Sequence, residues 1–185
     1  MPMRWDALFA DMEAQLASAR DAVRDSEVAE RLRTDFAAME MSGRLQSQMG
    51  RPLKVDVGLP GSFQGVLSHV GRGWMVLETG GQSSVIALNH VVFIAGMDRF
   101  SASGTPAPRL GLASALRGLS RDRASVRVYP AGQQPAAALE GSVDRVGKDF
   151  FELSLIPRGE ARRPENVRGV YVLALQSVAV VSSLL

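Results

Sequence analysis

The sequence predicts an α+β fold that is mainly β: a long N-terminal helix followed by two tandem five-stranded small β-barrels, each preceded by a helix. Two observations predict this fold. Residues 63–78 return without a gap as residues 139–154, so one group of strands is present twice. Residues 3–48 contain no Pro and a single Gly, and they are rich in Ala, Glu, Arg, Gln and Met, which is the composition of a helix.

The N-terminal helix is predicted to occupy residues 1–50. Gly50 and Pro52 end it, because glycine is a frequent helix terminator and proline lacks an amide donor. Apolar residues recur along it at alternating spacings of four and three, which is the heptad period of a coiled coil. We expect this seam to join a second copy of the chain; the alternative is that it packs back on the barrels. The seam consists of Trp5, Phe9, Met12, Leu16, Ala19 and Val23, of which the first four are the expected interface residues.

Both barrels are predicted from short apolar runs separated by glycine-rich turns. The first occupies residues 51–98, and a linker rich in Ser, Gly, Thr and Pro follows at 99–109. Residues 110–185 contain a short amphipathic helix and the second barrel. The repeat continues there, since residues 85–94 match residues 172–181. The offset between the copies rises from 76 residues (63 to 139) to 87 (85 to 172), so the second copy carries an insertion of 11 residues.

Alternation of apolar and polar residues in the second copy indicates which side chains face its core. Transferred to the first copy, this register places apolar side chains on the outer face of the first barrel as well. That face must then be covered by the long helix, the other barrel or a second chain. The further interface residues predicted on this basis are Val66, Trp74, Val76 and Phe150.

Several features resemble the Sm-like fold, whose family includes the bacterial RNA chaperone Hfq and the eukaryotic Sm and Lsm proteins. They are a short helix before five strands, a glycine in the second strand of each copy (Gly65 and Gly141), and His90 before the last strand of the first copy. The glycines lie where the family has the residue that lets this strand bend. The resemblance implies two tandem Sm-like barrels and RNA binding on the faces of rings.

Most catalytic chemistry is excluded by the composition. The chain has no cysteine, so it has no disulfide and no thiolate nucleophile or ligand. His69 and His90 are the only histidines, and neither has a partner at a metal-ligand spacing. We therefore expect no enzyme, no metal and no cofactor. Without a signal peptide or a ~20-residue apolar span, we expect a cytoplasmic protein with no membrane contact.

Positive charge is concentrated in the C-terminal part of the chain. Residues 101–185 carry eleven Arg and Lys against seven acids, whereas residues 1–50 carry six Arg against nine acids. Arginines in such a cluster bind phosphates in a sequence-tolerant way. The predicted nucleic-acid-binding residues are Arg109, Arg117, Arg121, Arg123, Arg127, Arg162, Arg163 and Arg168.

The function predicted from these patterns is that of a non-catalytic small-barrel protein that binds RNA or single-stranded DNA through its basic second barrel. An alternative is an oligomeric protein–protein adaptor or assembly scaffold with no nucleic-acid ligand. In both hypotheses the protein forms a homo-oligomer, with a dimer as the first expectation.

Overall fold

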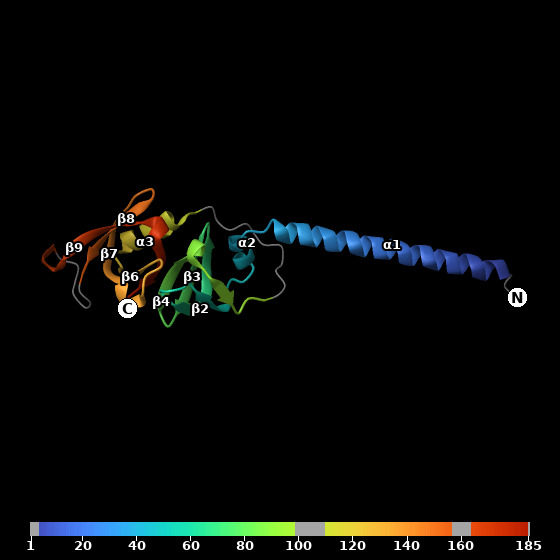
Figure 1. Cartoon of the computed structure of the whole chain (residues 1–185), viewed down its shortest axis with the longest axis horizontal. Helices are drawn as coiled ribbons and strands as arrows, with labels where there is room; N and C mark the ends of the chain where they lie inside the picture. Colours follow the sequence, from blue (N-terminus) through green and yellow to red (C-terminus); the bar gives the residue numbers. More distant parts are fainter. Residues whose placement is uncertain (1–3, 99–109, 157–163, 185) are drawn as a thin grey trace. The chain divides into compact units, whose positions relative to one another are not determined.

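The computed structural model describes residues 4–98, 110–156 and 164–184. The chain divides into two compact units, Met1–Glu40 and Met41–Leu185. The first unit is almost entirely one helix, and every described strand belongs to the second unit (Figure 1).

Helix α1 extends from Arg4 to Ala37. Its 34 residues give it a length of ~51 Å at a rise of ~1.5 Å per residue. The Met39 amide donates to the Phe36 carbonyl at 3.1 Å, and this tight turn closes the helix. A separate short helix, α2 (Met41–Gln46), begins the second unit, so the helical region before Gly50 consists of two helices.

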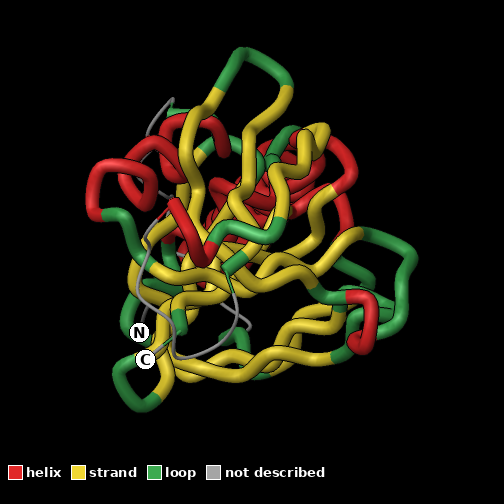
Figure 2. Tube along the Cα trace, turned by 90° about the vertical axis from the view of Figure 1, so that its left-hand side faces the viewer, coloured by secondary structure: helices red, strands yellow, loops and turns green. Residues whose placement is uncertain are grey.

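The second unit contains a ten-stranded antiparallel sheet in the order β5-β1-β2-β3-β4-β10-β6-β7-β8-β9. Its strands curve instead of lying flat (Figure 2). The strands are β1 Pro52–Asp56, β2 Ser62–Gly71, β3 Trp74–Thr79, β4 Gln82–Ala87, β5 Phe93–Ala95, β6 Ser125–Pro130, β7 Leu139–Val146, β8 Phe150–Leu155, β9 Gly169–Ala174 and β10 Val178–Ser183. The remaining helices are α3 Leu112–Asp122 and the short 3₁₀ segments η1 Leu88–His90, η2 Pro135–Ala137, η3 Pro164–Asn166 and η4 Leu175–Ser177.

The prediction of two separate five-stranded barrels is wrong, because β4 of the first copy pairs with β10 of the second and joins all ten strands into one open sheet. The physical reason lies in the faces of these two strands. Val85 and Val181 belong to one core, while their neighbours Ile86 and Val180 belong to another. Strands that are apolar on both faces need cover on both sides, and a barrel with one solvent-facing surface does not provide it.

The duplication itself is visible in the strand pairing. The β2–β3 ladder shifts register between Leu67 and His69, and the β7–β8 ladder shifts between Val143 and Arg145. These two irregularities are 76 residues apart, the same offset as in the sequence repeat. Each copy thus bends its second strand at the same place, with the extra local twist that a β-bulge provides.

Gly65 and Gly141 occupy a close approach between strands. A Cβ atom on Gly65 would lie 2.6 Å from the Glu78 carbonyl oxygen, and one on Gly141 would overlap the Ser154 carbonyl oxygen. The neighbouring strand therefore leaves no room for a side chain at either position.

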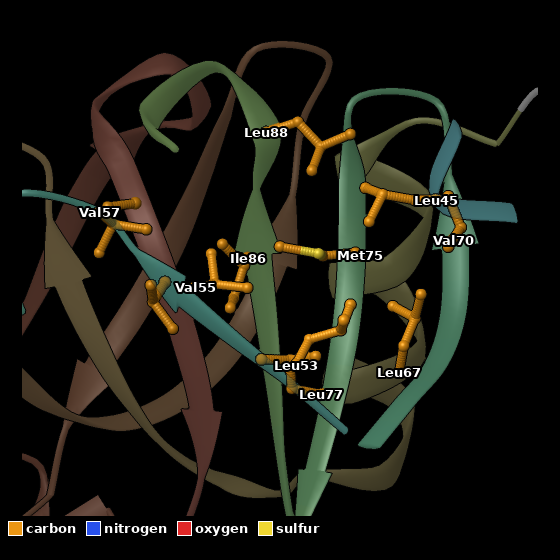
Figure 3. Close-up of a cluster of buried hydrophobic side chains, with 12 residues drawn as sticks. Leu45, Leu53, Val55, Val57, Leu67, Val70, Met75, Leu77, Ile86 and Leu88 are labelled. Atoms are coloured by element: carbon orange, nitrogen blue, oxygen red, sulfur yellow. The ribbon is translucent and has the colours of Figure 1, made fainter. Parts of the chain in front are cut away.

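Two hydrophobic cores lie on opposite faces of the central strands. The first core contains Leu45 of α2 together with Leu53, Met75 and Ile86, and Figure 3 shows the last two lying side by side. The second core is formed by β3, β4, β10, α3 and the strands of the second copy. Its buried members are Trp74, Val85, Leu116, Val126, Val128, Val143, Phe151, Leu153, Val178 and Val181.

Strand β3 contributes to both cores. Met75 and Leu77 face the first, whereas Trp74 and Val76 face the second. The second copy of the same chain thus covers Trp74 and Val76, which belong to the apolar outer face predicted for the first copy. Trp74 is only 9% exposed, and its indole Nε1 donates to the Leu110 carbonyl at 2.8 Å. This bond ties the segment before α3 to the first copy.

Candidate interaction surfaces

Helix α1 presents its predicted seam to solvent. Met12 is 51% exposed, Leu16 54% and Val23 58%. The side chains of Trp5 and Phe9 lie outside the described residues. Beyond Val23 further large apolar side chains are exposed on this helix, namely Val28, Leu32 and Phe36. At ~3.6 residues per turn these three side chains lie more than ~100° around the helix from Leu16, so the seam keeps one face only as far as Val23. An exposed apolar stripe of this kind is typical of a helix that associates with another.

Part of the predicted arginine cluster meets on the surface of α3. Arg117 and Arg121 are exposed and lie one helical turn apart. Helix α3 packs against β7, and the Arg117 guanidinium donates from Nη2 to the Gly147 carbonyl at 3.0 Å. This contact brings Arg117 beside the β7–β8 turn, whose next residue is the exposed Lys148.

An aromatic ring lies at the same β7–β8 turn. A Cβ atom on Gly147 would lie 2.6 Å from a ring carbon of Phe150, so the ring covers this glycine. Phe150 is 38% exposed, which leaves part of its ring open to a ligand. We call the set of Arg117, Arg121, Lys148 and Phe150 the α3 basic surface. Arg123, the left-handed residue at the end of α3, is exposed nearby in sequence, as are the acids Asp122 and Asp149.

The other predicted arginines do not belong to this surface. Val126 and Val128 face the second core with α3, so alternation along β6 places Arg127 on the opposite face. There its Nε donates to Glu140 at 2.8 Å, and this bond, followed by one with Tyr129, raises the pKa of Arg127. The charge of Arg127 is thus compensated within the fold. Arg168 is exposed just before β9, and Arg109, Arg162 and Arg163 lie outside the described residues.

The predicted interface residues of the sheet separate into two groups. Trp74 is buried and Val76 half-buried in the second core, so within this chain they serve packing. Val66 on β2 and Phe150 on β8 are exposed. The second copy therefore covers the outer face of β3 in the first copy and leaves Val66 of β2 open to solvent.

The two end strands of the sheet carry apolar side chains that were not among the residues predicted from the sequence. On β9, Val170, Tyr171 and Val172 are all exposed; on β5, Phe93 is exposed. The signal in the sequence was a difference between the copies: the equivalents of the β9 residues on β4 are Ser83, Ser84 and Val85. A strand at the sheet edge carries Val and Tyr where the paired, internal strand carries serine.

Two ionisable side chains, those of Asp56 and His90, make hydrogen bonds that stabilise local structure. Ser62 Oγ donates to Asp56 at 2.7 Å, and this bond, followed by one from the Gly58 amide, lowers the pKa of Asp56. His90 Nε2 donates to the Gln176 carbonyl at 2.8 Å, which links η1 to η4. No group of three or more His, Asp or Glu that could hold a metal ion occurs in the part of the chain that the structure describes.

A groove of about 450 Å³ lies over β1, β2 and β5. Lys54 is its one charged lining residue, and Gln64 and Thr79 are its polar side chains. This lining contains no paired acid and base. Its other lining residues are Pro52, Leu53, Gly65, Ala95 and Gly96.

No family model matches the chain, and no curated protein and no solved structure matches it either. The resemblance to the Sm-like family therefore stays a prediction, and the surfaces above are interpreted from their own geometry. Among the described helices, none combines the length and the apolar character needed to cross a membrane.

Proposed function

We propose that this protein is a non-catalytic, cytoplasmic assembly protein whose copies associate through helix α1. The exposed apolar side chains of α1 carry this proposal. Burial of apolar surface is worth ~25 cal/mol per Å², so covering the seam side chains along the ~27 Å of helix between Trp5 and Val23 stabilises a pair. A second copy of α1 matches both the length and the heptad spacing of the seam between Trp5 and Val23. A dimer is the simplest product.

The test is the mass of the purified full-length chain by sedimentation equilibrium. We expect a multiple of the chain mass of 19.9 kDa. The double variant Leu16→Glu/Val23→Glu places two charges on the seam and should reduce the mass to a smaller multiple. As a matched control, Ala14→Glu/Ser18→Glu adds the same charges about 200° around the helix from seam positions and should leave the mass unchanged. A wild-type mass of one chain, or equal effects of both double variants, would overturn the proposal.

A second candidate function is the binding of RNA or single-stranded DNA, and the α3 basic surface favours it. Cations and an aromatic ring are the groups that hold a phosphate backbone and stack a base, and Arg117, Lys148 and the partly exposed Phe150 all lie at or next to the β7–β8 turn. The geometry supports this binding through Arg117 and Lys148, because the bond from Arg117 to Gly147 brings the helix and the turn together.

This candidate is tested by fluorescence anisotropy with a labelled oligouridine. Arg117→Ala/Arg121→Ala should weaken binding at least ten-fold. It should also lower the dependence of log affinity on log salt concentration by about 0.7 for each phosphate that is no longer neutralised. The control Arg20→Ala/Arg24→Ala removes the same charge from one turn of α1 and should change affinity little. An equal loss in both variants, or no binding at low salt, would contradict the proposal.

A further inference from the structure

The junction in the middle of the sheet shows how the two copies of the repeat join. It pairs the fourth strand of the first copy, β4, with the fifth strand of the second, β10. The paired residues are Ser84 with Ser182, Val85 with Val181, and Ile86 with Val180. The junction is well bonded: the Oγ atoms of Ser84 and Ser182 are 2.8 Å apart, and the Ser83 amide donates to Ser183 Oγ at 2.9 Å.

The strands left at the two ends of the sheet are the counterparts of this pair. Among the described strands, β5 ends one side of the sheet and β9 ends the other. By the offset of 87 residues, β5 is the equivalent of β10 and β9 is the equivalent of β4. One edge of the sheet therefore carries β9, the equivalent of β4, and the other edge carries β5, the equivalent of the strand with which β4 pairs.

The composition of β9 favours hydrogen-bonded pairing of this edge with another strand. Gly169–Ala174 contains no charged residue and no proline, which are the usual protections of an edge strand. Val172 is 67% exposed, whereas its equivalent Val85 is 7% exposed beneath the internal junction. Phe93 on β5 is 48% exposed, whereas its equivalent Val180 is fully buried. Val85 and Val180 are thus buried at the β4–β10 junction, whereas their equivalents at the two edges of the sheet are exposed.

We propose that β9 of one copy pairs with β5 of a second copy, antiparallel and in the register of the β4–β10 junction. Transferring that register by 87 residues opposes Tyr171 to Ala95, Val172 to Ile94, and Leu173 to Phe93. The contact is head-to-tail, so it closes into a ring when the rotation per copy permits and otherwise extends into a filament. It uses a surface other than α1 and does not depend on association through that helix.

Because the chain contains no cysteine, introduced cysteines report this contact without background. Ala95 and Tyr171 are the equivalents of Ser182 and Ser84, whose side chains meet at the internal junction, and both are exposed. The proposed register therefore brings their Cβ atoms close to the ~3.8 Å that a disulfide requires. Singly substituted Ala95→Cys and Tyr171→Cys proteins are mixed, oxidised with diamide and resolved on a non-reducing gel. Peptide mass spectrometry then identifies the joined residues.

We expect several-fold more covalent dimer from the mixture than from either protein alone. The control mixture of Ala95→Cys with Val172→Cys should give little dimer, because a shift of one residue moves the side chain to the other face. Both mixtures are repeated in the Leu16→Glu/Val23→Glu background, where the result should be unchanged. Equal cross-linking of the two mixtures, or none in the Tyr171 mixture, would overturn the proposal.

A charge on the edge provides a second measurement that does not need a disulfide. In the same background, Val172→Lys should lower the sedimentation coefficient to that of a single chain, since a lysine on an edge strand opposes its pairing with another strand. Gln176→Lys, an equal charge change at an exposed position of η4, should leave the coefficient of the assembly unchanged. An assembly that survives Val172→Lys would contradict pairing through β9.

Discussion

Replacing Trp74 by alanine is expected to lower the free energy of unfolding of the Met41–Leu185 unit by about 3–5 kcal/mol. Trp74 belongs to the first copy of the repeat but packs in the second core, which also contains Leu116 and Phe151. The substitution leaves a large cavity between the copies and removes the hydrogen bond from Nε1 to the Leu110 carbonyl. Scanning calorimetry measures the loss as a lower melting temperature.

Phe150→Ala is the matched control, because Phe150 occupies the equivalent position in the second copy, 76 residues later. Its ring is partly exposed and lies over Gly147, so its removal should cost only about 1 kcal/mol. A similar loss in both variants would show that the second copy does not bury Trp74. Separate melting transitions for the two copies in the Trp74→Ala protein would contradict a single shared sheet.

The second large effect is expected for Gly141→Ala, which should destabilise the same unit by about 1–3 kcal/mol. The added methyl group would overlap the Ser154 carbonyl oxygen on the neighbouring strand. Because this oxygen belongs to a backbone paired on both sides, it moves only if β8 shifts relative to β7 or β9. Urea unfolding followed by circular dichroism measures the change.

Gly118→Ala provides a control of opposite sign. Gly118 lies within α3, and a Cβ atom there meets no other atom within 4 Å. Alanine in a helix interior is favoured over glycine by about 0.5–1 kcal/mol, so this variant should be more stable than the wild type. Stabilisation by Gly141→Ala would show that β7 and β8 approach each other less closely at this point.

Local features of the fold could be predicted from the sequence because they depend on neighbours along the chain. The helical composition before Gly50 and the repeated strands are of this kind, and so are the glycines at Gly65 and Gly141. The choice of partner for β4 is different. Its consecutive apolar residues, Val85 to Ala87, indicate only that both faces are apolar, and several arrangements would cover them. The pairing of Val85 with Val181, far away in the sequence, selects one continuous sheet instead of two barrels.

For the candidate surfaces too, features that depend on neighbours along the chain could be predicted, and features that depend on tertiary packing could not. Arg117 and Arg121 could be placed together from helical spacing alone, and the structure adds Lys148 through the packing of α3 on β7. Arg127 belongs to the same run of arginines, but strand alternation turns it to the other face, where Glu140 compensates its charge. A count of charges along the sequence does not distinguish these environments, because it contains no information on which face each residue occupies.

The position of β10 in the sheet has a consequence for how the nascent chain folds on the ribosome. β10 is the last strand in chain order, yet it lies in the middle of the sheet, where Val178–Val181 are buried. The partner of Ser84 on β10 is Ser182, which is synthesised 98 residues later. The edge of β4 that pairs with β10 therefore stays unpaired until then. Until then an emerging polypeptide displays an open β4 edge next to apolar side chains, a species prone to aggregate. The free edge of β4 in the first copy is therefore paired only after β10, the last described strand of the second copy, has left the ribosome.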